Sequence, residues 1–388
     1  MTARPRRASP DQRGAGLIEL MISVAIGMLL VLVIYQTYEV SESQKRTIAS
    51  GSDASQNASY ATYLLSRDIS MAGSAVASSA TALDHCSVLA PFTAAQLPGG
   101  LRPIPVAINA GANDQTPDQI TVFYGGSSTL STPVGFRISS TVPFPYQVAS
   151  AVAFSQGDVI AAVSGPQCTL STIDHGGVVV VDPCLPPICT ERVATITHTP
   201  IPGSPTVTYT SGGAAALVNL GPVTAFTRVV YSVDPDCGKD STQCTLRSQS
   251  VLPLGGPGAL APPAPIVADV VNLKAEYGLD TSVPADGIVD TWVQAKGPWS
   301  FASVTASPGP PLTTLQQIRA IRLAVVTRSA EYERDIVTPG PLKIFAGADA
   351  AADGATAVSM GLTADQRHYR YRVFETVIPL RNAMWNAP

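Results

Sequence analysis

The sequence carries little charge. Lys, Arg, Asp and Glu make up 13% of the 388 residues, about half the share of roughly 25% that is usual in soluble globular domains. The 24 basic residues do not outnumber the 28 acidic ones, and the formal net charge is −4. Neutralising phosphates requires a basic patch or stripe. We therefore expect no nucleic-acid partner.

Catalytic motifs are also missing from the sequence. It contains no G-x-S-x-G, no P-loop, no H-E-x-x-H and no G-x-G-x-x-G opening a helix. The four histidines, His85, His175, His198 and His368, are scattered along the chain. We expect neither an enzyme nor a bound cofactor.

The N-terminus combines a basic leader with a long apolar run. Residues 1–14 hold four arginines against one aspartate, and residues 15–35 contain a single charged side chain, Glu19. Residues 20–35 alone would form roughly 24 Å of helix, and the whole run is long enough to cross a bilayer of about 30 Å. Basic residues before the run and mixed charges after it predict a cytoplasmic N-terminus. The rest of the chain would then lie outside the inner membrane.

Glu19 distinguishes this run from a plain anchor or a secretory signal. A charge in the middle of a bilayer costs about 2.5–3.5 kcal/mol on insertion scales, so such a residue usually has a partner and a function. A secretory signal would be cut at a small-x-small site after the run, and the residues that follow Tyr35 offer none.

The segment Gly14-Ala-Gly-Leu-Ile-Glu19-Leu-Met21 resembles the class III signal of type IV prepilins. The resemblance implies that the prepilin peptidase cuts between Gly14 and Ala15 and methylates the new amino group of Ala15. Glu19 would become the fifth residue of the mature chain and could neutralise the amine of a neighbouring subunit. Two charges that are costly alone in lipid become tolerable as a pair. Gln36 stands where major pilins commonly carry a proline, so a helix kink there is not expected.

Four stretches are predicted along the chain: a cleaved leader at 1–14, a transmembrane and assembly helix at 15–35, its amphipathic continuation at 36–72, and a β-rich head at 73–388. Ala58, Ala61, Leu65, Ile69 and Ala72 recur at helical spacing, which predicts one apolar face with Arg67 and Asp68 off it. Gly51-Ser52-Asp53 is a weak point of the helix. The fold class is α+β and type IV pilin-like: a long N-terminal helix packed on an antiparallel β-sheet with long loops.

Strands in the head are predicted from β-branched runs bounded by turn residues. They cover 104–108, 119–124, 159–163, 177–181, 206–209, 225–233, 244–251, 266–277, 318–327 and 371–378, with a short helix at the start of 318–328 as an alternative. Residues 95–103, 253–265 and 303–313 read as loops, and 346–362 as a mobile excursion.

Four segments resemble the PilW family of minor pilins, in the family's order: residues 64–73, 274–280, 318–329 and 371–382, the last closing with Leu380-Arg381-Asn382. The resemblance implies a minor pilin that helps to prime pilus assembly, with other minor pilins, the major pilin and the prepilin peptidase as partners. It also implies a move from the inner membrane to the pilus tip, where a large adhesin is often supported. A J-type pseudopilin of type II secretion is one alternative, and a membrane-anchored periplasmic binding domain is another. Residues 90–260 resemble the family weakly, so the head has room there for its own insertions.

Six cysteines lie in the head, and an even number in an exported domain favours disulfides. Cys237 and Cys244 bracket a short loop, and Cys184 and Cys189 could close another, which would leave Cys86 with Cys168. A zinc site would need paired C-x-x-C or Cys/His spacing, which is not present. Asp280, Asp286 and Asp290 are weak calcium candidates, but Pro284 interrupts their loop and no closing Glu follows. A solvated turn is the favoured interpretation, and no metal is expected.

Overall fold

The computed structural model describes residues 16–76, 83, 84, 86, 102, 104–126, 132–141, 145–165, 167–181, 193–202, 204, 207–212, 215–234, 237, 244–252, 262–306, 309–346 and 357–384. The chain divides into two compact units, Met1–Ser52 and Asp53–Pro388. The second is called the head unit below. Helix α1 (Leu17–Met71) begins in the first unit and ends in the second.

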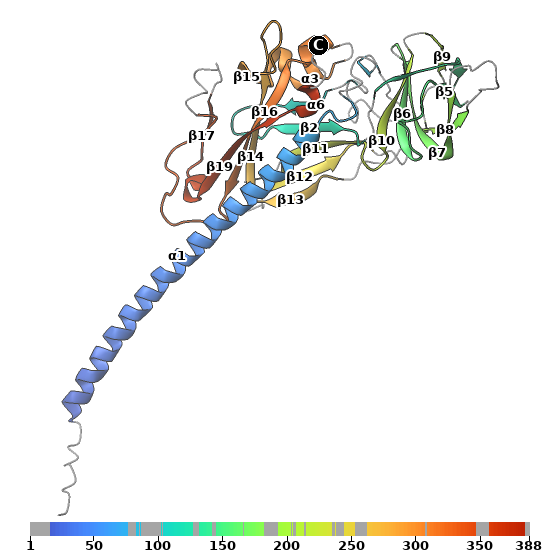
Figure 1. Cartoon of the computed structure of the whole chain (residues 1–388). Coiled ribbons are helices and arrows are strands. Elements are labelled where there is room, and N and C mark those ends of the chain that lie inside the picture. The colour runs from blue at the N-terminus through green and yellow to red at the C-terminus, as the bar shows by residue number, and fades with distance from the viewer. Residues whose placement is uncertain are drawn as a thin grey trace, which may run out of the picture. The chain divides into compact units, whose positions relative to one another are not determined.

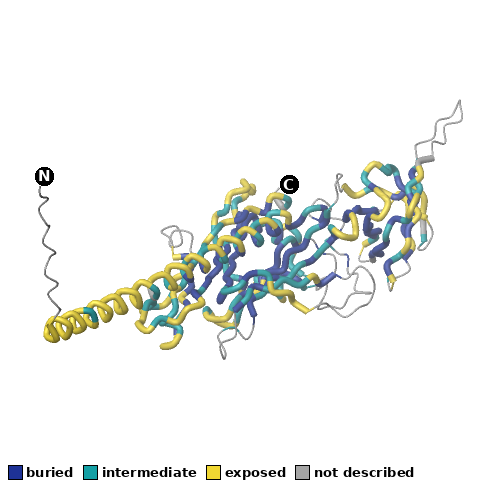
Figure 2. The backbone as a smooth tube through the Cα atoms, turned by 90° about the horizontal axis from the view of Figure 1, so that it is seen from below, coloured by how far each residue is buried: buried dark blue, intermediate teal, exposed yellow. Residues whose placement is uncertain are grey.

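Helix α1 is continuous over 55 residues (Figure 1). No proline occurs within it, and Gln36 and Gly51 are both helical, so neither a kink at Gln36 nor a break at the predicted weak point is seen. In the first unit, the residues of α1 from Leu17 to Tyr35 are almost all exposed (Figure 2). One helix among the described residues is long and apolar enough to cross a membrane, and it is α1.

Two antiparallel sheets form the centre of the head unit. The first has the order β1-β2-β11-β12-β13 and the second the order β15-β14-β16-β19. The bounds in the first sheet are β1 (Val106–Asn109), β2 (Gln119–Tyr124), β11 (Thr227–Val233), β12 (Thr245–Ser250) and β13 (Ala264–Ala268); those in the second are β14 (Val270–Leu279), β15 (Thr291–Gln294), β16 (Ile318–Arg328) and β19 (Tyr371–Pro379). Below they are called the first and the second sheet.

The main core lies where the end of α1 meets both sheets. Ala61, Leu65 and Ile69 of α1, and Ala72 just after it, are fully buried there. They share one cluster with side chains of the first sheet, such as Val122 and Leu246, and of the second, such as Leu273, Leu323 and Ile378. The apolar face predicted from the spacing is therefore the face that the sheets cover.

A separate lobe is inserted between two neighbouring strands. Strands β2 and β11 are hydrogen-bonded with Tyr124 opposite Thr227, so the chain leaves after β2 and returns beside the same point. Residues 125–226, called the inserted lobe below, carry a six-stranded sheet of order β3-β10-β6-β7-β8-β5 and a two-stranded pair β4-β9. The bounds are β3 (Val134–Gly135), β4 (Ser140–Thr141), β5 (Tyr146–Val148), β6 (Asp158–Ser164), β7 (Gln167–Val181), β8 (Val193–Pro200), β9 (Thr208–Tyr209) and β10 (Ala216–Pro222).

The two crossings between lobe and sheet are tightly packed. A Cβ on Gly125 would lie 2.4 Å from the carbonyl oxygen of Leu220, and one on Gly126 would lie 2.1 Å from the Cβ of Ala225. Real Cβ atoms do not approach so closely, so glycine is needed at both positions. The lobe then packs on the back of the first sheet through a cluster that includes Phe123 and Phe226, whose rings meet edge to face at 5.5 Å.

Short elements complete the head unit: η2 (Gly297–Trp299), α3 (Phe301–Val304), α4 (Leu312–Leu315), β17 (Leu342–Ile344), β18 (Val358–Met360), η3 (Asp365–His368) and α6 (Arg381–Met384). Strands β17 and β18 pair with each other and cover the face of the second sheet opposite α1, through Ile344, Phe345 and Met360.

The fold class predicted from the sequence is confirmed, with corrections to its details. Residues 357–362 are not a mobile excursion, because they contain β18 and bury Val358, Met360 and Leu362. Residues 318–328 are strand throughout; the short helix α4 ends before them, at Leu315. Residues 95–101 and 253–261 lie outside the described residues.

Candidate assembly helix and its anchor in the head

The first turn of α1 carries the one acidic residue of the apolar run. Glu19 lies in that turn and is exposed, and the amide of Leu20 begins the helical pattern by donating to the carbonyl of Gly16 at 3.1 Å. Gly14 and Ala15, the predicted processing residues, lie outside the described residues. A carboxylate at a helix N-terminus is stabilised by the helix dipole, but this effect alone does not explain why a charge stands in an apolar segment.

The apolar segment of α1 is not buried against any other part of the described chain. Its most apolar window has a mean hydropathy of 2.8, and none of it is buried. A shallow apolar hollow on one face is lined by Val24, Gly27, Met28, Val31, Leu32 and Tyr35, and a Cβ on Gly27 would meet nothing within 4 Å. Small residues of this kind let neighbouring helices approach closely in a membrane. The segment is thus built for contact with lipid or with other helices.

The end of α1 is anchored in the head unit by a buried carboxylate. Asp68 is 4% exposed and accepts hydrogen bonds from the hydroxyl of Tyr231 in β11 and from Nε of Arg67 at 3.0 Å. The expectation that Asp68 lies off the packed face is therefore wrong, whereas the Arg67 side chain is 55% exposed as expected. Asp68 is three residues from Leu65 and so sits at the margin of the same face. Burial, followed by the bond to Asp68, raises the pKa of Tyr231.

Polar contacts also hold α1 at both ends of its packed stretch. Asn57 donates to the carboxylate of Asp269 at 3.1 Å, and the hydroxyl of Thr327 donates to the carbonyl of Ala54 at 2.9 Å. At the C-terminal end, Nδ2 of Asn382 donates to the carbonyls of Met71 and Ala72 at 3.2 and 3.1 Å. A helix end leaves its last carbonyls without intrahelical partners, so Asn382 caps α1 from the far end of the chain.

The closing Leu380-Arg381-Asn382 segment has a structural role at the end of α1. Leu380 is fully buried in the main core, and its amide donates to the carbonyl of Arg319 at 2.8 Å. This pairing fixes where α6 begins and brings Asn382 to the end of α1. Gly73, with φ of 78°, lets the chain turn away immediately after the helix.

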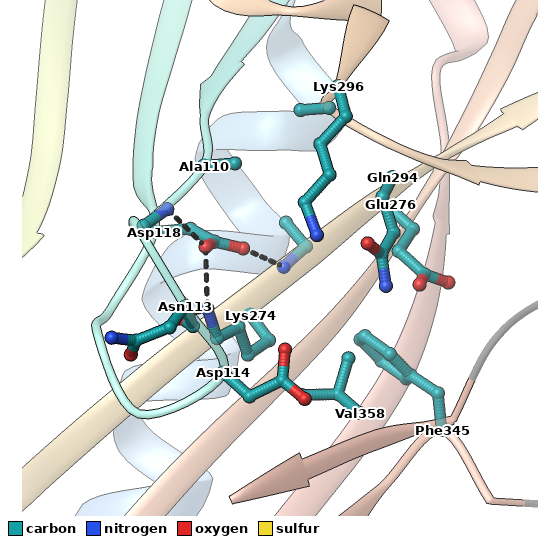
Figure 3. A pocket seen from close by; sticks show the side chains of 13 residues that line it. Ala110, Asn113, Asp114, Asp118, Lys274, Glu276, Gln294, Lys296, Phe345 and Val358 are labelled. Carbon is teal, nitrogen blue, oxygen red and sulfur yellow. Dashed lines mark hydrogen bonds and ion pairs between the residues drawn. The ribbon is translucent and has the colours of Figure 1, made fainter.

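Residues 274–280 on β14 use their polar side chains to join separate elements. Nζ of Lys274 donates to the carboxylate of Asp118 at 2.9 Å and to the carbonyls of Asn113 and Thr116 at 3.1 and 2.7 Å (Figure 3). The other oxygen of Asp118 accepts from the amide of Ala275 at 3.0 Å. The β1–β2 loop is therefore fixed across β14 by a buried ion pair.

A further ion pair ties β14 to β16. Arg322 donates to Glu276 at 2.5 Å, and its guanidinium lies over the rings of Trp292 and Phe345 at 5.0 and 4.5 Å. Burial raises the pKa of Glu276 above its ordinary value, with Arg322 acting in the opposite direction. Next to Glu276 in the sequence, the hydroxyl of Tyr277 accepts a hydrogen bond from the amide of Ile108 at 2.7 Å.

The predicted calcium candidates organise their own loop. Asp280 accepts from Nε of Arg319 at 3.2 Å and from the amide of Gly287 at 2.8 Å. Asp290 accepts from the amide of Thr281 at 2.7 Å, and Asp286 from the amide of Ile288 at 2.9 Å. Within the described part of the chain, no group of three or more His, Cys, Asp or Glu side chains is placed to hold a metal. Each of the three aspartates instead accepts hydrogen bonds from protein groups.

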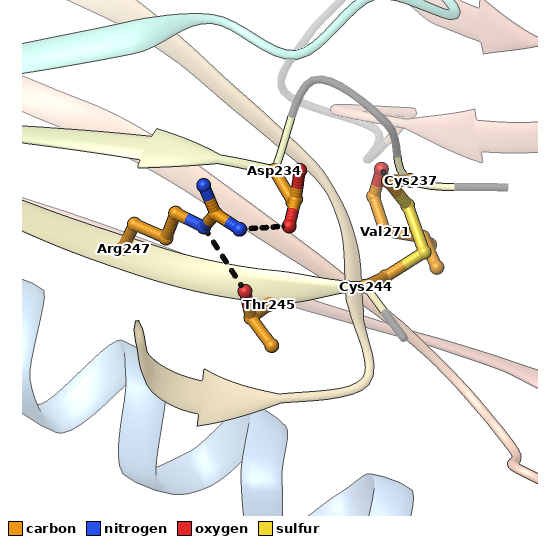
Figure 4. Close-up of a disulfide and its surroundings, with 6 residues drawn as sticks. All are labelled: Asp234, Cys237, Cys244, Thr245, Arg247 and Val271. Carbon is orange, nitrogen blue, oxygen red and sulfur yellow. Dashed lines mark hydrogen bonds and ion pairs between the residues drawn. A yellow bond between two sulfur atoms is a disulfide. The ribbon is translucent and has the colours of Figure 1, made fainter. Parts of the chain in front are cut away.

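Two disulfides join cysteines among the described residues of the head unit. Cys86 bonds to Cys168, with 5.5 Å between their Cα atoms, and Cys237 bonds to Cys244, with 4.6 Å. The first joins the segment after α1 to strand β7 of the inserted lobe; the second closes the loop between β11 and β12 (Figure 4). Both are among the pairs considered from spacing. Cys184 and Cys189 lie outside the described residues.

The described histidines do not gather into a site. His198 stacks on Tyr146 inside the lobe, with ring centroids 3.8 Å apart, and His368 stacks on Tyr332 at 4.7 Å. His175 is exposed, and His85 lies outside the described residues.

Comparison with known proteins yields two family matches. Residues 230–382 match the PilW model, described as Type IV Pilus-assembly protein W, and residues 9–35 match the prokaryotic N-terminal methylation motif. The first match runs from β11 to α6 and leaves out the inserted lobe. No curated protein matches the chain. Among solved structures, it is similar to the type IV-like pilin TTHA1219 from Thermus thermophilus at 12% identity, covering 59% of this chain and 86% of that one. The TM-score of 0.21 is too low for that likeness to carry an argument.

Proposed function

We propose that this chain, which is a PilW-like type IV pilin, is a minor subunit that helps to prime pilus assembly and comes to lie at the pilus tip. The prepilin peptidase would remove residues 1–14, cutting between Gly14 and Ala15, and would methylate Ala15. Residues 15–35 would hold the precursor in the inner membrane, residues 36–72 would continue the helix into the head, and residues 73–388 would form the periplasmic and later extracellular head.

The observation that carries this proposal is Glu19 in the first turn of an exposed apolar helix. A carboxylate there is costly in lipid unless a cation accompanies it. The methylated amine at Ala15 of a neighbouring pilin supplies such a cation, and pairing would set the axial register between subunits. The exposed apolar side chains around it would supply cohesion through helix packing.

The anchor of α1 supports the same proposal from the other end of the helix. Buried apolar contacts, Asp68 with Tyr231 and the cap from Asn382 all fix residues 54–72 in the head unit. A subunit whose helix packs in a filament must transmit load from that helix to its head. The proposed partners are the major pilin, other minor pilins and, at the tip, a large adhesin.

Substitution of Glu19 tests the assembly role. In a deletion strain, Glu19→Ala should still be processed but should restore few surface pili, because the register pair is lost. Glu39→Ala removes an exposed carboxylate of the same helix beyond the apolar run and should restore piliation fully. Normal piliation with Glu19→Ala would show that the pairing role is wrong.

The deletion strain itself separates pilus assembly from type II secretion. Loss of surface pili and twitching, with secreted enzymes unaffected, is the expected result. Loss of a secreted enzyme with pili intact would instead assign the chain to a secretion system.

A further inference from the structure

A cavity of about 370 Å³ lies in the head unit. Its wall includes the β1–β2 loop, the end of β11, the end of β16, β18 and the start of β19. Small-molecule sites usually measure about 300–1,000 Å³, so the cavity has the size of a ligand site. Its main polar side chains are Gln115, Gln119, Asp234, Arg328 and Gln366.

The lining suits a ligand rich in hydroxyl groups. Three glutamines face the cavity, and each amide can both donate and accept a hydrogen bond, as a hydroxyl can. Val233, Val271, Met360 and Tyr371 provide apolar surface between them. The amide oxygens of Gln119 and Gln366 accept from Nδ2 of Asn109 at 3.4 Å and from the amide of Thr363 at 3.0 Å, and the NH₂ groups remain able to donate to ligand oxygens. A ring that carries hydroxyls and C–H faces satisfies both kinds of surface.

Arg328 favours a ligand that carries negative charge. Its guanidinium lies over the ring of Tyr369 at 4.3 Å, and, while burial raises the pKa of Tyr371, Arg328 acts to lower it. Asp269 interacts electrostatically with Arg328, but the carboxylate of Asp269 accepts its hydrogen bond from Asn57. Throughout the described ranges, no carboxylate lies within ion-pair distance of Arg328, whereas other guanidinium groups of the head unit have such partners.

The carboxylates in the cavity wall are already engaged. Asp234 is paired with Arg247 beside the Cys237–Cys244 disulfide (Figure 4), and Asp118 is paired with Lys274 (Figure 3). Arg328 is therefore the cation in the wall that can take a ligand carboxylate, for which its planar fork is well suited.

Two parts of the wall are held in place. The disulfide closes the loop at Cys237, and Lys274 binds two carbonyls of the β1–β2 loop. A wall that is fixed before binding loses little conformational entropy when a ligand enters. We infer that this cavity binds an acidic saccharide, a sugar ring with a carboxylate and several hydroxyls, as in uronic acid chains. This inference does not depend on the proposed role in assembly.

The test is calorimetric titration of the full chain in detergent micelles with a galacturonic acid oligomer, and with a neutral glucose oligomer of equal length. The wild type should bind the uronate saturably and at least tenfold more tightly than the neutral oligomer. Arg328→Gln should weaken uronate binding by about tenfold or more, because it removes a charge-assisted bond. Arg372→Gln, an exposed arginine on the same strand as Tyr371, should bind like the wild type.

A second variant fills the cavity without touching Arg328. A Cβ at Gly361 would meet the flexible end of Gln115 at 3.2 Å, so Gly361→Leu should fold and should abolish binding. Three results would overturn the inference: no saturable uronate binding by the wild type, unchanged affinity in folded Arg328→Gln and Gly361→Leu, or equal binding of a polyglutamate peptide.

Discussion

The carboxylate of Asp68, in the last turn of α1, accepts a hydrogen bond from the hydroxyl of Tyr231 in β11, 163 residues away in the sequence. Both residues are buried. The long helix and the first sheet are thereby joined by a specific polar contact in addition to apolar packing. In the proposed assembly role, this contact would link the helix that packs in the filament to the head.

Removing the Tyr231 hydroxyl should weaken the attachment of α1 to the first sheet. Tyr231→Phe leaves a buried carboxylate that still accepts from Nε of Arg67, and we expect a loss of about 1.5–3 kcal/mol in the free energy of unfolding. Tyr63→Phe removes an exposed hydroxyl from the same helix and should change little. Urea unfolding of the full chain in detergent measures both, and equal stability of the two variants would contradict the role given to this bond.

The cap at the end of α1 provides a second prediction. Asn382→Ala leaves the carbonyls of Met71 and Ala72 without their side-chain donor, at an expected cost of about 1 kcal/mol. Amides in the last turn of α1 should then exchange faster with solvent. Arg381→Ala, at the exposed neighbouring position, is the control. Identical exchange in both variants would show that Asn382 does not hold the helix end.

The Lys274–Asp118 pair should be costly to break from one side. Lys274→Met leaves the Asp118 carboxylate buried without its cation, and loss of one partner of a buried pair typically costs about 3–5 kcal/mol. Lys274→Met combined with Asp118→Asn removes the buried charge and should recover part of this loss. A double-mutant cycle measures the coupling, and strictly additive effects would contradict the pairing.

The raised pKa of Glu276 predicts a pH dependence. As pH rises above the ordinary value of 4.5, the unfolded chain releases this proton before the folded chain does. The folded state then binds more protons, so the contribution of Glu276 to stability falls as pH rises through this window. The destabilisation caused by Glu276→Gln should therefore shrink from pH 4 upwards, roughly until the folded group has ionised. A destabilisation that grows with pH would contradict the assignment.

Periodic features were predictable from the sequence, whereas long-range pairs were not. The stripe from Ala58 to Ala72 identified the buried face of α1, because helical spacing alone determines which side chains share a face. Asp68 was placed wrongly, since its partner Tyr231 is distant in sequence and polarity alone suggested exposure. Lys274 and Asp118, 156 residues apart, could not be paired without the fold.

The inserted lobe shows a different limit. Its strands β8 (Val193–Pro200) and β10 (Ala216–Pro222) were not predicted, because Pro, Gly and Asn in and around them resemble loop signals. Glu19 was the opposite case: the basic leader, the glycine, the charge and the apolar run occur together within a short stretch, so the prepilin signal could be read directly.

The central claim is that the chain is processed and assembled as a pilin, and the mass of its N-terminal peptide tests it most directly. The protein would be expressed with and without the prepilin peptidase, and the peptide identified by mass spectrometry. We predict a methylated peptide that begins at Ala15 and occurs only with the peptidase. A chain that still begins at Met1 with the peptidase present, or that is cut beyond Tyr35, would contradict the account.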